Sequence, residues 1–323
     1  MSDQLPAAVP GTLPALQADL AERLAHSAHH ARGTMAAETV RAWERGRAAF
    51  FRWCEDRERC ALPAEPEVVA DYVDTLALKG VKAATIRQAV WAITVTHRMA
   101  RYPDPAKGEE VRLALKRMAR QLGTRQRQAA PLGGRELERI LATAGRTLPA
   151  LRNVALVLTM SDLLARRSEA VALAMEDVQH APDGSATALI RRSKTDQEGA
   201  GAVLWLSPRT VTALRQWTQA AGITEGAIFR AVNKAGRVGE PLTGGDVPRI
   251  LKRLAEGAGL DPSDVSGHSC RVGTAQDMVA AGEDTAGIMQ AGRWKSPTMP
   301  ARYGERLAAG RGAVARLYER NRR

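Results

Sequence analysis

The chain has 323 residues, of which 45% are hydrophobic and 25% charged, a composition typical of globular proteins and not of disordered ones. That length is sufficient for two domains, each with a core of its own. Lysine and arginine total 47 against 35 acidic residues, a formal net charge of +12. Such an excess favours a polyanionic partner, and it favours nucleic acid over a membrane surface. The alternative is that the source organism has generally basic proteins.

Aromatic residues make up only 4% of the chain, so alanine, leucine and valine must fill the interior, which favours helices. We find no signal peptide and no apolar run of membrane-spanning length. Cys54, Cys60 and Cys270 lack the spacing of metal ligands and are expected to be reduced thiols. Together these features predict a soluble cytoplasmic protein that does not associate with a membrane.

The first part of the chain is predicted to be a short tail followed by a helical domain. Residues 1–15 are rich in proline, alanine and glycine, which is typical of a loose terminus. Over residues 16–122, apolar residues recur at helical spacing. The predicted helices cover residues 36–57, 65–78, 84–100 and 108–122.

Basic residues gather on the polar faces of these helices. Residues 79–127 contain twelve lysines or arginines and three acidic residues. Within the predicted helix 108–122, Arg112, Lys116 and Arg120 form one row, since residues four apart share a helix face. The predicted nucleic-acid contacts of this domain are Arg41, Arg45, Lys82, Arg87, Arg112, Lys116 and Arg120.

Residues 123–132 have no periodicity and several helix-breaking residues, so they are predicted to be a linker. A second domain is expected over residues 133–323. Its predicted helices cover residues 134–145, 148–164, 208–220, 243–258, 268–281 and 284–290. Two β-rich runs, 187–192 and 203–206, are joined by the glycine-rich turn 198–201 and predict a small hairpin. The fold class is therefore mainly α with a small β-sheet.

Several residues of the second domain suit an attack on a phosphodiester. Such a reaction requires stabilisation of a negatively charged phosphorane, a nucleophile and a proton donor for the leaving oxygen. Arg166 and Arg271 are candidates for the first task because a guanidinium can donate two hydrogen bonds to phosphate oxygens. Glu169, three residues after Arg166, could orient it. The alternative is that each arginine is an ordinary surface residue, and Arg167 competes with Arg166 for the role.

His268 and Lys194 are the candidates for proton transfer. His268 lies one helical turn before Arg271, which would place both side chains at one cleft. Lys194 lies at the predicted hairpin tip, where a flexible ammonium could protonate the leaving oxygen. A structural histidine and a solvated turn lysine are the alternatives.

Trp294 and Tyr303 complete the set, separated by nine residues. The indole N–H could donate to a phosphate oxygen, and the phenol could be the nucleophile; a core tryptophan is the alternative for the first. A phosphotyrosyl ester stores about as much energy as the linkage it replaces, so nucleotide hydrolysis is unnecessary. The chain also lacks the G-x-x-x-x-G-K-[ST] phosphate-binding motif. We therefore expect neither a cofactor nor a metal ion.

These residues, in this order, resemble the tyrosine recombinase (phage integrase) family and its Cre-like branch. The resemblance rests on the catalytic set, on Ser266-Gly-His-Ser-Cys-Arg-Val-Gly273, on Ile288-Met-Gln-Ala-Gly292 and on the spacing from Trp294 to Tyr303. It covers most of the chain. It implies a two-domain C-shaped clamp around duplex DNA, 3′-phosphotyrosyl intermediates, strand exchange through a Holliday junction, and a homotetramer on two sites with inverted repeats.

The resemblance also implies a role for each residue. Arg166 and Arg271 would bind the phosphate, Lys194 would be the general acid, and Tyr303 the nucleophile. His268 and Trp294 would complete the pocket, with His268 accepting a proton, and Glu169 would support Arg166. A terminal helix over about 307–320 would dock on a neighbouring protomer, although its apolar stripe could equally pack on its own domain.

Two features depart from the family pattern. Pro300 lies three residues before Tyr303, which predicts a tyrosine helix that is short or that forms only on activation. Gly244 and Gly245 stand where a base-reading side chain is expected. DNA contacts there are therefore predicted for Arg249, Lys252 and Arg253, or readout depends on DNA shape.

Two other functions fit parts of this pattern. A type IB topoisomerase or telomere resolvase would use much the same catalytic residues. A catalytically silent DNA-binding protein would retain the DNA-binding clamp without the cleavage activity. The filled catalytic positions argue against the silent protein, and the apolar terminal helix argues for an assembling recombinase.

Overall fold

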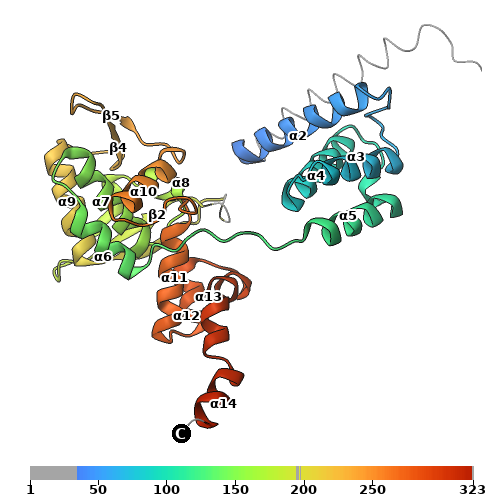
Figure 1. Cartoon of the computed structure of the whole chain (residues 1–323). Coiled ribbons are helices and arrows are strands. Elements are labelled where there is room, and N and C mark those ends of the chain that lie inside the picture. Colours follow the sequence, from blue (N-terminus) through green and yellow to red (C-terminus); the bar gives the residue numbers. More distant parts are fainter. Residues whose placement is uncertain (1–34, 194–195, 197, 322–323) are drawn as a thin grey trace, which may run out of the picture. The chain divides into compact units, whose positions relative to one another are not determined.

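The computed structural model describes residues 35–193, 196 and 198–321, and it divides the chain into two compact units, residues 1–126 and 127–323 (Figure 1). The division falls within the segment 123–132. The later part of that segment belongs to the second unit, because the Ala130 N–H donates to the Asp264 carbonyl and Leu132 is buried in the core. The described residues are mainly helical, as the composition predicts, and they include two small sheets.

The first unit is a set of helices around an apolar core. Val69, Ile86, Ile93 and Met118 are almost completely buried there, and Phe50 contacts Tyr72 ring to ring. The elements are α2 (Ala37–Glu55), α3 (Pro66–Leu78), α4 (Ala83–Met99), the short η1 (Pro105–Lys107) and α5 (Glu109–Leu122). These bounds agree with the four predicted helices to within two residues at each end.

The second unit begins with α-helices and a small sheet. Its elements, in order, are α6 (Gly134–Thr143), α7 (Leu148–Asp162), α8 (Arg167–Ala172), η2 (Met175–Asp177), β1 (Val178–His180), β2 (Ala186–Ile190) and β3 (Ala202–Leu206). The strands form one antiparallel sheet in the order β1-β2-β3. Ala186 pairs with Leu206, and Ile190 with Ala202.

The unit continues with α9 (Pro208–Ala221), β4 (Arg230–Val232), β5 (Val238–Pro241), α10 (Asp246–Gly257), α11 (Ser269–Ala281), α12 (Thr285–Gly292), α13 (Thr298–Gly310) and α14 (Ala313–Asn321). β4 and β5 pair as a second antiparallel hairpin. The sequence predicts β2 and β3 but not β1, β4 or β5. These strands have only three or four residues, too few to show an alternating pattern.

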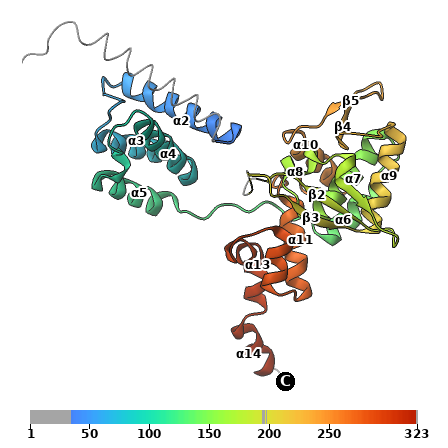
Figure 2. The ribbon, with the colours of Figure 1, turned by 180° about the vertical axis from the view of Figure 1, so that it is seen from behind.

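The core of the second unit surrounds α7. Leu156 and Met160 of this helix are fully buried, as are Trp217 of α9 and Phe229, and the Trp217 indole donates to the Ile228 carbonyl at 2.8 Å. α11 packs against α7 and beside α13. The neighbouring α11 and α13 can be seen from both directions in Figures 1 and 2. The packed α7 and α11 therefore provide a rigid base for the side chains at their ends.

The last two helices differ from the prediction. α13 runs over 13 residues, so the expectation of a short tyrosine helix is wrong. Pro300 is its third residue, where the N–H would have no helical partner in any case. The predicted terminal helix 307–320 is divided: its first residues belong to α13, Arg311 and Gly312 interrupt it, and α14 begins at Ala313. Among the described helices, none is both long enough and apolar enough to cross a membrane.

Candidate active site

Arg166 and Glu169 are joined at the start of α8. Arg166 Nη1 lies 2.6 Å from Glu169 Oε1, and the Arg166 N–H donates to Glu169 Oε2 at 2.9 Å. Glu169 thus holds both the backbone and the side chain of Arg166 at the helix N-terminus. The Glu169 side chain is only 1% exposed, which fixes its direction. The neighbouring Arg167 is exposed and takes no part in this ion pair.

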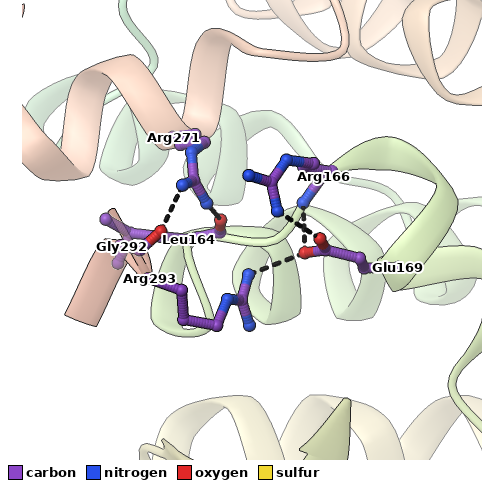
Figure 3. Close-up of polar contacts among 6 residues, drawn as sticks. All are labelled: Leu164, Arg166, Glu169, Arg271, Gly292 and Arg293. Carbon is purple, nitrogen blue, oxygen red and sulfur yellow. Dashed lines mark hydrogen bonds and ion pairs between the residues drawn. The ribbon is translucent and has the colours of Figure 1, made fainter. Parts of the chain in front are cut away.

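Arg271 is anchored by two helix ends. It is buried in the first turn of α11, and its guanidinium donates to the carbonyls of Leu164 and Gly292 (Figure 3). Leu164 follows α7 and Gly292 ends α12, so both carbonyls lie at the negative end of a helix. Carbonyl dipoles orient the Arg271 side chain and leave its net charge in place.

The surroundings of Arg271 are strongly positive. The pKa of Arg271 is lowered to about 10, chiefly by burial and then by the nearby charges of Arg166 and Arg293, while Glu169 and Tyr303 act in the opposite direction. These four side chains therefore lie close to Arg271. Arg271 remains protonated at neutral pH, and the electrostatic cost of that charge would fall if an anion bound nearby.

Trp294 and Tyr303 lie beside this cluster. The Arg271 guanidinium lies over the Trp294 ring, 4.4 Å from its centroid, a cation–π contact. The Trp294 and Tyr303 rings meet edge to face with centroids 5.7 Å apart. Five of the seven predicted catalytic residues therefore form one connected group: Arg166, Glu169, Arg271, Trp294 and Tyr303.

His268 and Lys194 are the two remaining candidates. His268 immediately precedes α11, one turn before Arg271, and its side chain is exposed. Lys194 lies outside the described residues; the adjoining Ser193 and Asp196 exchange backbone hydrogen bonds at 3.1 Å across it. Cys270, between His268 and Arg271, is not a competing nucleophile, because burial raises the pKa of its thiol to about 12.

Arg293 belongs to the same group, although the sequence does not predict it. Its Nη2 lies 2.6 Å from Glu169 Oε2, so Glu169 binds Arg293 as well as Arg166 (Figure 3). Burial lowers the pKa of Arg293, Glu169 raises it, and Arg166 lowers it again. Its position directly before Trp294 was the available signal. That position alone does not identify it, because an arginine after a helix end usually lies on the surface.

A cavity of about 470 Å³ adjoins the group. The ends of β2 and β3 and the hairpin between them form one wall, including Ile190 and Asp196, and Met289, Arg293 and Trp294 form another. Ser193 also lines this cavity.

The predicted DNA contacts are all exposed: Arg41, Arg45, Lys82, Arg87, Arg112, Lys116 and Arg120 in the first unit, and Arg249, Lys252 and Arg253 on α10. Three of them also pair with acids one turn earlier on their helices, Arg41 with Glu38, Arg112 with Glu109 and Arg249 with Asp246. Exposed pairs of this kind contribute little to stability and can open for a phosphate.

Comparison with known proteins agrees with this geometry. Residues 132–309 match the model of the phage integrase family. The chain is 29% identical over 290 residues to recombinase cre of Escherichia phage P1, covering 84% of each chain. It is 32% identical over 279 residues to an integrase/recombinase xerD homolog of Selenomonas ruminantium, covering 82% of this chain and 80% of the relative.

Among solved structures, the Tn1549 transposon integrase in complex with circular intermediate DNA is similar in fold, with a TM-score of 0.61. It is 14% identical, and the match covers 88% of this chain and 94% of that one. The family match spans more than half of the chain and includes the whole arginine–tyrosine group. The chain therefore belongs to the phage integrase family, the tyrosine-type site-specific DNA recombinases.

Proposed function

We propose that Tyr303 attacks a DNA backbone phosphate, displaces the 5′-hydroxyl and forms a 3′-phosphotyrosyl intermediate. The observation that carries this assignment is the gathering of Arg166 and Arg271 beside Trp294 and Tyr303. Three guanidiniums and one carboxylate leave this group with an excess of positive charge. That excess suits a phosphodiester, which gains a further negative charge as it becomes a pentacoordinate phosphorane.

Each side chain has a role in this proposal. Arg166 and Arg271 donate hydrogen bonds to the non-bridging oxygens, and Trp294 supplies a further N–H donor. His268 accepts the phenolic proton, and Lys194 protonates the departing 5′-oxygen. Because the phosphotyrosyl bond conserves the energy of the broken linkage, the released 5′-hydroxyl can reverse the step without ATP or a metal ion.

We further propose that two such cuts, exchanged between two DNA sites, give a Holliday junction. Four protomers, two on each site with its inverted repeats, would carry this out. The basic residues of the first unit and of α10 would hold the duplex, with phosphate contacts supplying most of the affinity. The bound DNA in the Tn1549 complex supports a duplex partner. Since that partner is DNA, we expect the protein to act in the cytoplasm of its host.

A covalent trapping experiment tests this function. The binding site would first be selected from random-sequence DNA by the full-length protein, then made as duplexes with a nick beside each candidate scissile phosphate. Loss of the short fragment after cleavage prevents rejoining, so the wild-type protein should accumulate a 3′-linked adduct. Tyr303→Phe should bind the same duplex with a Kd within about twofold and yield no adduct, because only the nucleophilic oxygen is lost.

The position of the covalent bond decides the assignment. Peptide mapping of the adduct should place the nucleotide on Tyr303. An adduct on another residue, or a wild-type protein that binds the site tightly without any adduct, would contradict the proposal. The second result would indicate a silent DNA-binding protein.

A further inference from the structure

Arg293 occupies a backbone position that arginine rarely adopts. Its φ of 53° and ψ of 46° place it in the left-handed region, which favours glycine. The turn that ends α12 requires this conformation: the Arg293 N–H donates to the Gln290 carbonyl at 3.1 Å, and the Trp294 N–H to the Met289 carbonyl at 2.9 Å. A glycine would meet the local requirement better, so the retention of arginine indicates a use for its side chain.

The Arg293 side chain is directed to Glu169. It is only 13% exposed, and its Nη2 lies 2.6 Å from Glu169 Oε2. Glu169 binds Arg166 with its other oxygen, also at 2.6 Å, so the two arginines reach one carboxylate from two sides (Figure 3). Among the described contacts, Arg271 is the one arginine of the three that lies over a ring of the Trp294–Tyr303 pair.

The other two guanidinium nitrogens of Arg293 are enclosed by the protein. Nε and Nη1 are inaccessible to solvent and have no hydrogen-bond partner among the described residues. A group so enclosed is unsuited to receive a DNA phosphate. The ion pair with Glu169 is therefore the contact through which Arg293 can influence the reaction.

That ion pair joins two distant parts of the sequence. Arg166 and Glu169 begin α8, whereas Arg293 stands in the turn between α12 and Trp294, a sequence separation of 124 residues from Glu169. Gly292 in the same turn accepts from Arg271, and a Cβ at Gly292 would lie 2.0 Å from the Trp294 ring. Both phosphate-facing arginines thus depend on this turn, Arg271 through Gly292 and Arg166 through Glu169.

We propose that Arg293 is a positioning residue of the recombination reaction, which holds Glu169 so that Glu169 directs Arg166 at the scissile phosphate. With Arg293 absent, Glu169 keeps one partner and can turn with Arg166 away from the phosphate. Small displacements of groups that bind a transition state lower the rate strongly while affecting substrate binding little. This inference rests on the proposed function, since it assigns a residue to that same site.

The test uses the full-length protein, the selected DNA site and single-turnover cleavage of the nicked duplex. Arg293→Gly suits the left-handed backbone and removes only the side chain. We expect its cleavage rate to fall about 10- to 100-fold, with the Kd for the intact site within about twofold of wild type. Arg293→Lys, which keeps a cation near Glu169, should recover a large part of the lost rate.

A double-mutant cycle separates positioning from simple structural support. Glu169→Gln removes the carboxylate charge that both arginines bind. If Arg293 acts through Glu169, Arg293→Gly should lower the rate less than about threefold when Glu169→Gln is already present. If the two losses multiply in full, Arg293 acts independently of Glu169 and the proposal is wrong.

Two controls complete the experiment. Arg209→Ala removes one positive charge from the same unit, as Arg293→Gly does, together with an exposed ion pair to Glu138. It should leave cleavage unchanged. Arg293→Asn, a second neutral residue that tolerates the left-handed conformation, replaces Arg293→Gly should that variant melt early. An Arg293→Gly protein that cleaves at the wild-type rate overturns this inference alone. A wild-type protein that forms no adduct overturns the proposed function and this inference together.

Discussion

The arginines of the candidate active site are neutralised to different degrees by their partners. Arg166 and Arg293 share the Glu169 carboxylate, whereas Arg271 donates to two carbonyl oxygens that carry no net charge. Carbonyls at helix ends stabilise a buried cation without cancelling it. Arg271 is therefore the residue of the group best able to attract an anion. Burial lowers its pKa most, and the neighbouring charges of Arg166 and Arg293 lower it in addition.

A buried histidine in the first unit illustrates a structural role at the residue scale. His97 is 1% exposed; its Nδ1–H donates to the Ile93 carbonyl at 2.9 Å, and its Nε2 accepts from the Ala64 N–H at 2.8 Å. Accepting that hydrogen bond requires a neutral ring. Burial lowers the pKa of His97 below its usual 6.5, against smaller opposing effects of Ile93 and Asp104.

This arrangement predicts that the first unit loses stability in mild acid. Below pH 6.5 the unfolded chain takes up a proton at His97 that the folded chain refuses, so unfolding becomes easier until the pH reaches the lower folded pKa. The unfolding free energy should fall by at most about 1.4 kcal/mol for each pH unit. Amide hydrogen exchange of α4, corrected for its intrinsic rate, would measure it between pH 7.5 and 5.

Two substitutions check that His97 causes this effect. His97→Gln should flatten the pH dependence, since an amide does not titrate. His180→Gln, the same change at an exposed histidine of β1, should leave the dependence as in the wild type. An equal slope in the wild-type and His97→Gln proteins would assign the acid sensitivity to other groups.

At the scale of elements, the second unit depends on one close approach. Gly273 of α11 lies against the chain that leads into α6: a Cβ at this position would lie 2.2 Å from the Leu132 carbonyl carbon and 2.3 Å from the Gly133 nitrogen. The Leu132 N–H donates to the Ser269 carbonyl at 3.0 Å and fixes this contact. The helix that carries Arg271 is thereby held against the entry to the catalytic unit.

Gly273→Ala should consequently destabilise the second unit. The methyl group would meet backbone atoms that cannot move without displacing Leu132 from the core, so we expect a loss of more than about 2 kcal/mol of unfolding free energy in urea. Gly257→Ala is the matched control. A Cβ at Gly257, in α10, would contact nothing within 4 Å, and alanine there should stabilise by up to about 1 kcal/mol.

The outcome distinguishes a rigid contact from an adaptable one. Gly273→Ala at wild-type stability would mean that residues 132–133 can shift without cost. A loss of stability in both variants would instead point to a general intolerance of larger residues in this unit.

The long helices and the site could be predicted to different extents. Apolar periodicity predicts α2 to α5 and α6, α7, α9 and α11 closely because each presents a full apolar stripe to a core. The proposed roles of Arg166, Glu169, Arg271, Trp294 and Tyr303 follow from residue type and order. Arg293 does not, because its importance depends on a left-handed turn that brings it to Glu169, a residue 124 positions earlier.

At the scale of the whole molecule, the last helix presents apolar side chains to solvent. Val314 is 81% exposed, Leu317 51% and Tyr318 62%, and α14 contains no buried residue. In both views α14 extends away from α13 at the end of the second unit (Figures 1 and 2). Such a stripe suits an intermolecular contact better than packing on its own unit, because the unit leaves it uncovered. We therefore infer that α14 serves the proposed assembly of protomers on DNA.

Replacing the two aliphatic residues of this stripe should separate assembly from folding. Val314→Ser with Leu317→Ser removes apolar surface that the single protomer does not bury, so its melting temperature should stay within about 2 °C of wild type. Two-site complexes on DNA, measured by analytical ultracentrifugation, should decrease at least tenfold, while binding to a single half-site stays unchanged. Val203→Ser, at an equally exposed apolar residue of β3, should affect neither property. A marked fall in melting temperature would show that α14 packs within its own protomer, and intact two-site complexes would place the assembly contact elsewhere.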